Sequence, residues 1–192
     1  MLMQKRAEEI FKKINVLQEG HFLYTSGRHG STYMQCARVL EYPNYTMELS
    51  TYLADAFKDD KIDVVIGPAM GGIIFAYEIA RQLGVKNLFT EREDGKMTLR
   101  RGYQIPKGAR VLVAEDVITT GGSVREVIDI VKEQGGELVG VAILVDRTNG
   151  KIDFDCKMKA VYSAEIISYD PDECPICKAQ TIPLVKPGSR KK

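Results

Sequence analysis

One stretch organises the rest of the chain: Val111-Leu112-Val113-Ala114-Glu115-Asp116-Val117-Ile118-Thr119-Thr120-Gly121-Gly122-Ser123. Its leading apolar residues run into two adjacent carboxylates, and a loop of Thr, Gly and Ser follows before a helical pattern begins. This order predicts a buried parallel strand that carries a sugar-phosphate site at its carboxyl end.

The loop after the acidic pair has the composition of an anion site. At the N-terminus of a helix, unpaired backbone N–H groups and the helix dipole favour a negative charge. Gly121 and Gly122 permit close approach of the backbone, and Thr119, Thr120 and Ser123 add hydroxyl donors. We therefore expect this loop to bind a phosphomonoester.

Glu115 and Asp116 can only accept hydrogen bonds when they are ionised. Vicinal sugar hydroxyls, a Mg²⁺ ion reached directly or through water, or both, would suit them. The alternative is that these acids only cap a helix or pair with a basic residue. Two adjacent acids beside an anion site repel one another unless a cation or a sugar lies between them, which favours the functional interpretation.

Strands and helices alternate on both sides of this stretch. Apolar runs predict strands at residues 62–66, 86–90 and 138–145, and periodicity predicts helices at 5–14, 45–57, 73–83 and after 123. The expected buried faces of the four helices are Ala7, Ile10, Phe11 and Ile14; Leu49, Tyr52, Leu53, Ala56 and Phe57; Ile73, Tyr77, Ala80 and Leu83; and Val124, Val127, Ile128 and Val131. This alternation predicts an α/β fold with a mostly parallel sheet and helices on both faces.

Three of the strands end in groups suited to a polar ligand: Gly67-Pro68, Glu115-Asp116 and Asp146-Arg147. Ligands of an open parallel sheet bind at the carboxyl ends of its strands. We therefore expect all three groups along one edge.

The composition is that of one soluble globular domain, with 192 residues, 44% of them hydrophobic and 28% charged. A net charge of +1 provides no electrostatic footprint for nucleic acid or an acidic membrane. No apolar run approaches the roughly 20 residues that span a bilayer, and no secretory signal is recognised. Four scattered cysteines make no disulfide framework, so we expect a cytoplasmic protein.

Two polar segments fall outside the strand–helix pattern. Residues 20–33 are rich in Gly, Ser, Thr and aromatics, which suits a loop or hairpin and also a cover over a polar ligand. Residues 91–108 are highly charged, and Asp94-Gly95 within them is a strong turn signal. This connector is expected to be a solvated hairpin, a mobile lid, or both. The chain contains neither a GxxxxGK[ST] phosphate loop nor a GxGxxG fingerprint.

The motif at residues 111–123 resembles the phosphoribosyl-diphosphate signature of type I phosphoribosyltransferases. Further segments resemble orotate phosphoribosyltransferases: Phe22-Leu23-Tyr24-Thr25-Ser26-Gly27-Arg28 with Tyr33, Ile66-Gly67-Pro68-Ala69-Met70-Gly71-Gly72, and Val145-Asp146-Arg147. The resemblance runs from about residue 6 to about residue 170. It implies one domain over residues 1–192, with a core at about 45–150, a small hood at about 1–44 plus 151–185, and a disordered tail at 186–192.

The resemblance also implies a reaction in which orotate N1 is joined to C1 of the ribose, giving orotidine 5′-phosphate and magnesium diphosphate. Glu115 and Asp116 would hold the ribose hydroxyls, Val117, Ile118, Thr119, Thr120, Gly121, Gly122 and Ser123 the 5′-phosphate, and Ala69, Met70, Gly71 and Gly72 the diphosphate. Thr119, Arg147, Ser26 and Gly27 would contact orotate. Mg²⁺ would be held mainly by the diphosphate, with Glu115 and Asp116 reaching it through water.

The family also has a mobile loop that closes over a neighbouring subunit's site, which implies a homodimer. Its usual histidine is absent from residues 91–108 of this chain. Asp116, together with Arg92 and Lys96 of this loop, is assigned to catalysis, and Arg100 or Arg101 could serve instead. Met70-Gly71 stands where many relatives have an aromatic residue and a lysine, so a lysine contact to diphosphate is lost there.

Two other functions compete with this interpretation. A purine phosphoribosyltransferase would share the phosphate motif, but Ser26-Gly27-Arg28 argues for orotate. A nucleotide-sensing regulator that binds RNA or DNA would need an added domain or a basic face. Only about 60 residues precede the first core strand, and the charge is nearly balanced.

The C-terminal part is less regular. Residues 159–162 and 164–167 are expected to be short strands, and the Pro-rich tail from Asp170 is expected to fray. Cys174-Pro175-Ile176-Cys177 is a lone CxxC, and a structural zinc would need two more ligands from Cys36, Cys156, His21 and His29. An unliganded tail is the expectation.

Overall fold

The computed structural model describes residues 2–24, 26–148, 150–164 and 166–187. Its main body is a six-stranded sheet in the order β5-β4-β3-β6-β7-β8. The bounds are β3 Val64–Pro68, β4 Lys86–Glu93, β5 Lys96–Thr98, β6 Arg110–Ile118, β7 Glu137–Asp146 and β8 Lys157–Ser163. All neighbours are parallel except β4 and β5, so the predicted mostly parallel sheet is confirmed.

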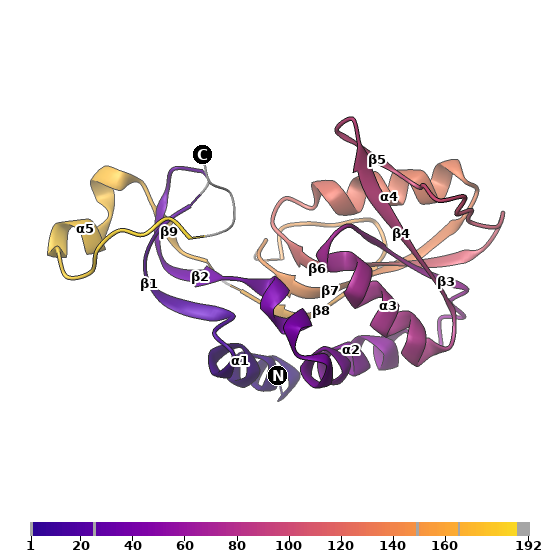
Figure 1. Cartoon of the computed structure of the whole chain (residues 1–192), viewed down its shortest axis with the longest axis horizontal. Helices are drawn as coiled ribbons and strands as arrows, with labels where there is room; N and C mark the ends of the chain where they lie inside the picture. The colour runs from indigo at the N-terminus through magenta and orange to yellow at the C-terminus, as the bar shows by residue number, and fades with distance from the viewer. Residues whose placement is uncertain (1, 25, 149, 165, 188–192) are drawn as a thin grey trace.

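Helices cover both faces of the sheet. Helices α1 (Leu2–Lys13), α2 (Pro43–Phe57) and α3 (Gly71–Leu83) lie on one face, and α4 (Gly122–Glu133) lies on the other (Figure 1). Each face has its own apolar core, one built around α1, α2 and α3 and the other around α4. The strands between them are apolar on both sides, as the continuous apolar run of β7 predicts.

The predicted faces of α1 and α4 are buried, whereas that of α3 is wrong in part. Phe75, Ala76, Ile79 and Ala80 face the core, while 57% of Tyr77 is exposed. The helix is apolar almost all round, so periodicity does not determine its rotation. Tyr52 on α2, also expected in the core, is 37% exposed at the surface.

A smaller three-stranded sheet forms the hood at one end of the molecule (Figure 1). Strands β1 (Leu17–Leu23) and β2 (His29–Met34) make an antiparallel hairpin, and β9 (Ser168–Tyr169) pairs with β2. A 3-10 helix, η1 (Cys36–Glu41), leads from the hairpin to the main body. The polar segment at residues 20–33 is therefore a hairpin.

The C-terminal segment follows β9 and returns to the hairpin. It contains η2 (Pro171–Glu173) and α5 (Pro175–Ala179). Further on, the Val185 N–H donates to the His21 carbonyl of β1 at 2.9 Å, and the Leu23 N–H donates to the Val185 carbonyl at 2.8 Å. The expected fraying from Asp170 is thus wrong for residues 170–185. The expected strand at 164–167 is also wrong, because pairing with β2 begins only at Ser168; residue 165 lies outside the described residues.

The packing revises the predicted division between core and hood. Helix α1 buries Ala7, Ile10 and Phe11 in the main core, and β8 is the edge strand of the main sheet, although both were expected in the hood. The described hood is therefore β1, β2, β9 and the segment after them. Residues 188–192, the greater part of the tail expected to be disordered, lie outside the described residues.

The charged connector at residues 91–108 is partly regular. Strand β4 continues to Glu93, turns at Asp94 and Gly95, both with positive φ, and returns as β5. The predicted hairpin is confirmed, and the irregular part begins only after Thr98.

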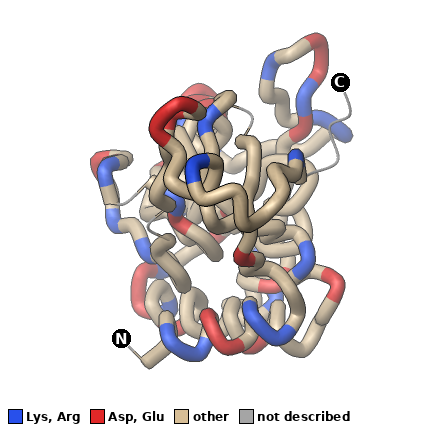
Figure 2. Tube along the Cα trace, turned by 90° about the vertical axis from the view of Figure 1, so that its left-hand side faces the viewer, with Lys and Arg blue, Asp and Glu red and all other residues tan. Residues whose placement is uncertain are grey.

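No helix in the described part of the chain is both long and apolar enough to cross a membrane. Basic and acidic residues are interspersed along the trace, as Figure 2 shows from the hood end of the molecule. The arrangement fits the near-neutral charge of the whole chain.

Candidate active site

The three polar strand ends meet at one edge, as predicted, because β3, β6 and β7 are adjacent and parallel. Ile118 at the end of β6 is paired with Asp146 at the end of β7. The Arg147 N–H then donates to the Ile118 carbonyl at 2.9 Å, which holds Arg147 beside the phosphate loop. The carboxyl group of Asp146 is buried and accepts the Thr148 N–H at 2.7 Å, so it caps the strand end.

Glu115 and Asp116 lie nearly buried near the end of β6, with 8% and 9% of their surfaces exposed. The Asp116 N–H donates to Glu115 Oε1 at 3.1 Å. Burial raises the pKa of both carboxyl groups, and for Glu115 the neighbouring Asp116 raises it further. The pair is therefore unfavourable as two free anions and is suited to a ligand that brings hydroxyl donors or a cation.

The turn between β3 and α3 lies directly against this acidic pair. A Cβ added at Gly71 would overlap the Asp116 carboxyl group, and one added at Gly72 would lie 3.1 Å from Glu115 Oε1. Ala69 is anchored by an N–H bond to the Thr90 carbonyl at 2.7 Å, and Met70 is 81% exposed. Residues 69–72, which are predicted to contact the diphosphate, thus lie against Glu115 and Asp116.

The predicted phosphate loop encloses a small cavity of about 60 Å³. It is lined by Glu115, Val117, Ile118, Thr119, Thr120, Gly121, Gly122, Ser123 and Val124. Gly121 adopts a φ of 72°, which favours glycine, and α4 begins immediately after it. A larger open hollow between α1, β1 and η1 contains none of the predicted site residues.

Arg147 faces the hood across this edge. Its Nε is buried and has no hydrogen-bond partner among the described residues. Burial raises the pKa of Tyr24 and Tyr33, and the positive charge of Arg147 opposes this rise in both tyrosines. The hairpin therefore brings two aromatic side chains near the Arg147 guanidinium group, and neither tyrosine was assigned to the site from the sequence.

The tip of the hairpin carries the two residues predicted to contact orotate from the hood. Ser26 and Gly27 are exposed there, and Gly27 has a φ of 83°. Thr25, part of the same motif, lies outside the described residues. Arg28 is used structurally, because it donates to Ser168 Oγ at 2.9 Å and pairs with Asp170 at 2.7 Å.

The basic residues of the connector are placed elsewhere. Arg92 makes a two-point pair with Glu126 of α4 at 2.6 and 3.0 Å, and Lys96 is exposed on the hairpin. Arg100 pairs with Glu93 and Arg101 with Glu91, each at 3.1 Å. No contact in the described part of the subunit joins these four cations to Glu115 or Asp116.

Comparison with known proteins agrees with this geometry. The model of the phosphoribosyl transferase domain matches residues 36–170. An orotate phosphoribosyltransferase of Caldanaerobacter subterraneus subsp. tengcongensis is 57% identical over 188 residues, which cover 98% of both chains. The chain belongs to the orotate phosphoribosyltransferase family. Another member, from Caldicellulosiruptor bescii, is 56% identical over 96% of both chains.

Solved structures of an orotate and of an adenine phosphoribosyltransferase have the same fold as this chain. The crystal structure of orotate phosphoribosyltransferase from Aeropyrum pernix has a TM-score of 0.70 at 26% identity and covers 86% of this chain and 94% of its own. Adenine phosphoribosyltransferase from Leishmania tarentolae has a TM-score of 0.64 at 18% identity, with coverage of 83% and 88%, which shows a shared fold. The protein is therefore a phosphoribosyltransferase.

Proposed function

We propose that this protein transfers the phosphoribosyl group of 5-phospho-α-D-ribose 1-diphosphate to orotate, giving orotidine 5′-phosphate and diphosphate in pyrimidine biosynthesis. The observation that carries the proposal is the full-length identity of 57% to an orotate phosphoribosyltransferase. The arrangement of acids, phosphate loop and Arg147 at one sheet edge supports it.

The acidic pair and the phosphate loop position the sugar. Glu115 and Asp116 accept hydrogen bonds from the ribose hydroxyls, and the loop at residues 117–123 donates its N–H and hydroxyl groups to the 5′-phosphate. The backbone of residues 69–72 approaches the diphosphate. Fixing both ends of the sugar orients C1 toward the base, and such positioning supplies a large part of the rate enhancement.

The reaction exchanges one bond at C1 for another. The bond from C1 to the diphosphate oxygen breaks, the sugar gains oxocarbenium character, and the diphosphate leaves with the electron pair. Orotate N1, without its proton, forms the new bond to C1. The residues around C1 thus act by orientation and by electrostatic stabilisation of the separating charges.

The acidic pair fits the Mg²⁺ that this reaction uses. Two nearly buried carboxyl groups with raised pKa values favour a site that receives positive charge with its ligand. Glu115 and Asp116 would reach the ion through water, while the substrate diphosphate would supply most of its direct ligands. Mg²⁺ supplies charge neutralisation on the leaving group when it is bound.

The base lies between Arg147 and the hood in this proposal. Orotate carries a carboxylate, and the unpaired Nε of Arg147 is a donor for it. Thr119 contributes from the phosphate loop, and Ser26 and Gly27 from the hairpin tip. A purine base has no carboxylate and would leave this guanidinium group without its partner.

A homodimer completes the site in this proposal. Large apolar side chains are exposed on α2 (Met47 and Tyr52), on α3 (Ile74 and Tyr77) and just before α3 (Met70). Large exposed apolar side chains on neighbouring helices suit an interface with a second subunit. Within one subunit no described contact joins Arg92 or Lys96 to the acids, so the connector at 91–108 would act on the neighbouring site. The dimer is expected to work in the cytoplasm.

A panel of bases tests the choice of substrate. Diphosphate release is measured with Mg²⁺ and phosphoribosyl diphosphate in the presence of orotate, adenine or hypoxanthine at equal concentrations. We expect release with orotate and background with both purines. Release with a purine and none with orotate would assign the protein to purine transfer.

A further inference from the structure

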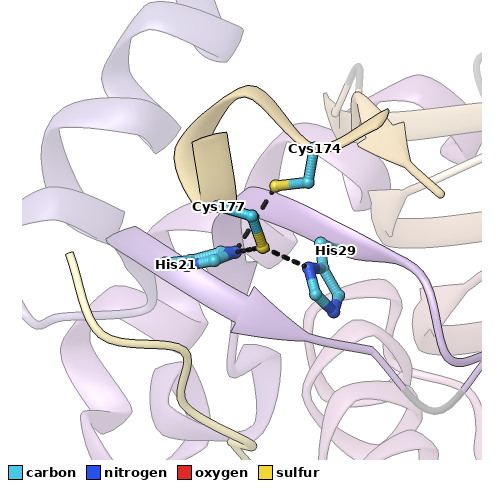
Figure 3. A group of neighbouring side chains, drawn as sticks. All are labelled: His21, His29, Cys174 and Cys177. Atoms are coloured by element: carbon cyan, nitrogen blue, oxygen red, sulfur yellow. Dashed lines mark hydrogen bonds between the residues drawn. The ribbon is translucent and has the colours of Figure 1, made fainter. Parts of the chain in front are cut away.

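Four potential metal ligands from distant parts of the chain meet in the hood (Figure 3). They are His21 on β1, His29 on β2, Cys174 after η2 and Cys177 on α5. All four ligand atoms lie within 4.8 Å of one another. Neither the phosphoribosyl transfer nor the main core uses these side chains.

Three distances between the ligand atoms match those of a tetrahedral zinc site. His21 Nε2 lies 3.4 Å from Cys174 Sγ and 3.6 Å from Cys177 Sγ, and His29 Nδ1 lies 3.3 Å from Cys177 Sγ. Zn–S bonds of about 2.3 Å and Zn–N bonds of about 2.0 Å in tetrahedral geometry separate the ligand atoms by about 3.3–3.8 Å. Two imidazoles and two thiolates are a common ligand set of structural zinc.

The surroundings of the cluster also suit a metal ion. His21 Nδ1 lies 3.1 Å from the Ile182 carbonyl, so the N–H of this ring points to the carbonyl and Nε2 keeps its lone pair for the metal. Exposure is 3% for His21, 6% for His29 and 0% for Cys174. Cys177 is half-buried, so three of the four ligands are shielded from water, which suits a closed structural site.

We propose that His21, His29, Cys174 and Cys177 bind one structural Zn²⁺ ion. The ion joins the C-terminal segment at 171–185 to the β1–β2 hairpin, in addition to the Val185 hydrogen bonds and the contact of Ile182 with His21. Because the same hairpin presents Ser26 and Gly27, the ion also fixes the part of the hood that faces Arg147.

A redox pair is the chemical alternative for a CxxC segment. The two cysteines are free thiols in the structure, and a disulfide would remove both sulfur ligands from the histidines. The two buried histidines aimed at the sulfurs favour the metal, since a disulfide has no use for imidazole ligands.

Metal content of the purified full-length protein tests the proposal without reference to activity. We expect about one zinc ion per chain by elemental analysis, and at least about tenfold less in Cys177→Ser and His21→Ala. Cys156→Ser is the matched control, because Cys156 lies outside the cluster, and it should keep its zinc.

Cobalt substitution provides a second measurement on the wild-type chain, in case a ligand variant fails to fold. Protein that is stripped and refilled with Co²⁺ should show thiolate-to-cobalt charge-transfer absorption and the visible bands of a tetrahedral complex. The stripped protein should lose its C-terminal segment to protease faster than the zinc form. Zinc well below one per chain after supplementation, a cobalt spectrum without thiolate bands, or a Cys174–Cys177 disulfide by intact mass would overturn the proposal.

Discussion

At the scale of single residues, the site depends on carboxyl groups that the fold keeps out of water. Glu115 and Asp116 are charged groups in a nearly buried place, because β6 brings them against the β3–α3 turn. Removing a charge from such a place stabilises the ligand-free fold while it impairs binding. Stability and function thus oppose one another at these positions.

Glu115→Gln should stabilise the ligand-free protein, and the gain should grow with pH. The folded pKa of Glu115 is raised above the value of about 4.3 in the unfolded chain. The native state therefore binds the proton more tightly, and the free energy of unfolding falls as pH rises through and above that value. Glutamine does not titrate and avoids this loss.

Thermal unfolding without Mg²⁺ or substrate measures the effect. The midpoint of the variant should match that of the wild type near pH 4.5 and exceed it by about 2–8 °C near pH 8. Glu133→Gln, at an exposed position of α4, serves as the control and should show no such trend. A gain that shrinks with rising pH would contradict the burial of this carboxylate.

Arg147→Ala should weaken orotate far more than phosphoribosyl diphosphate. The lost charge-assisted hydrogen bond to a carboxylate is worth about 1.5–3 kcal/mol, which corresponds to roughly a 10- to 150-fold rise in the KM for orotate. Steady-state kinetics with each substrate varied in turn separates the two. The control is Arg110→Ala, at the start of β6 and therefore at the opposite sheet edge. Equal losses for both substrates would argue against a base-side position of Arg147.

At the scale of secondary-structure elements, the β3–α3 turn has to pack against the acids without side chains. A Cβ at Gly67 would overlap the backbone carbonyls of Gly72 and Ala114, whereas the atoms nearest to one at Gly71 belong to the Asp116 side chain. Backbone cannot yield as a carboxyl group can. The two glycines should therefore respond differently to substitution.

Gly67→Ala should destabilise the fold more than Gly71→Ala, while both should reduce turnover. Overpacking costs about 1–3 kcal/mol, which lowers the melting temperature by roughly 2–12 °C for a chain of this size. Differential scanning calorimetry of the two variants checks the order. If Gly71→Ala kept normal turnover, the close contact between this turn and Asp116 would be unnecessary for catalysis.

The elements that the sequence predicts well are those with one apolar face. Helix α4 has four buried residues at helical spacing, and the sequence predicts this buried face correctly. Helix α3 is apolar nearly all round, so its rotation depends on the sheet and α2. The two-residue strand β9 exists only because β2 offers an edge for it, which no local pattern at residues 164–169 reveals.

For the site, too, the sequence predicts what is local and misses what depends on packing. Glu115, Asp116 and the phosphate loop are consecutive in sequence, so their proximity is predictable. The unpaired Nε of Arg147 and its tyrosine neighbours emerge only from packing of the hood. His21 and Cys174 are 153 positions apart, and spacing alone could not choose them over Cys36 and Cys156.

At the scale of the whole molecule, the site is proposed to need two subunits. Asp116→Asn and Lys96→Ala should each be nearly inactive, one through loss of the sugar contact and the other through loss of the lid cation. In an equal mixture whose subunits exchange, about a quarter of the sites combine an intact Asp116 with an intact lid from the partner. Activity should therefore recover toward about a quarter of the wild-type value.

The recovery is measured by mixing the variants and following turnover over time. A mixture of Asp116→Asn with Asp116→Ala is the control and should stay inactive. If the Lys96 mixture also stayed inactive although the subunits exchange, the lid would act within its own subunit or through Arg92, Arg100 or Arg101.

The most direct test of the central claim is the loss of orotate absorbance when the protein is given phosphoribosyl diphosphate and Mg²⁺. We expect orotate to disappear in step with the appearance of orotidine 5′-phosphate and diphosphate. The rate should depend on the concentrations of both phosphoribosyl diphosphate and Mg²⁺. Persistence of orotate in the complete mixture, with folded dimeric protein present, would contradict the account.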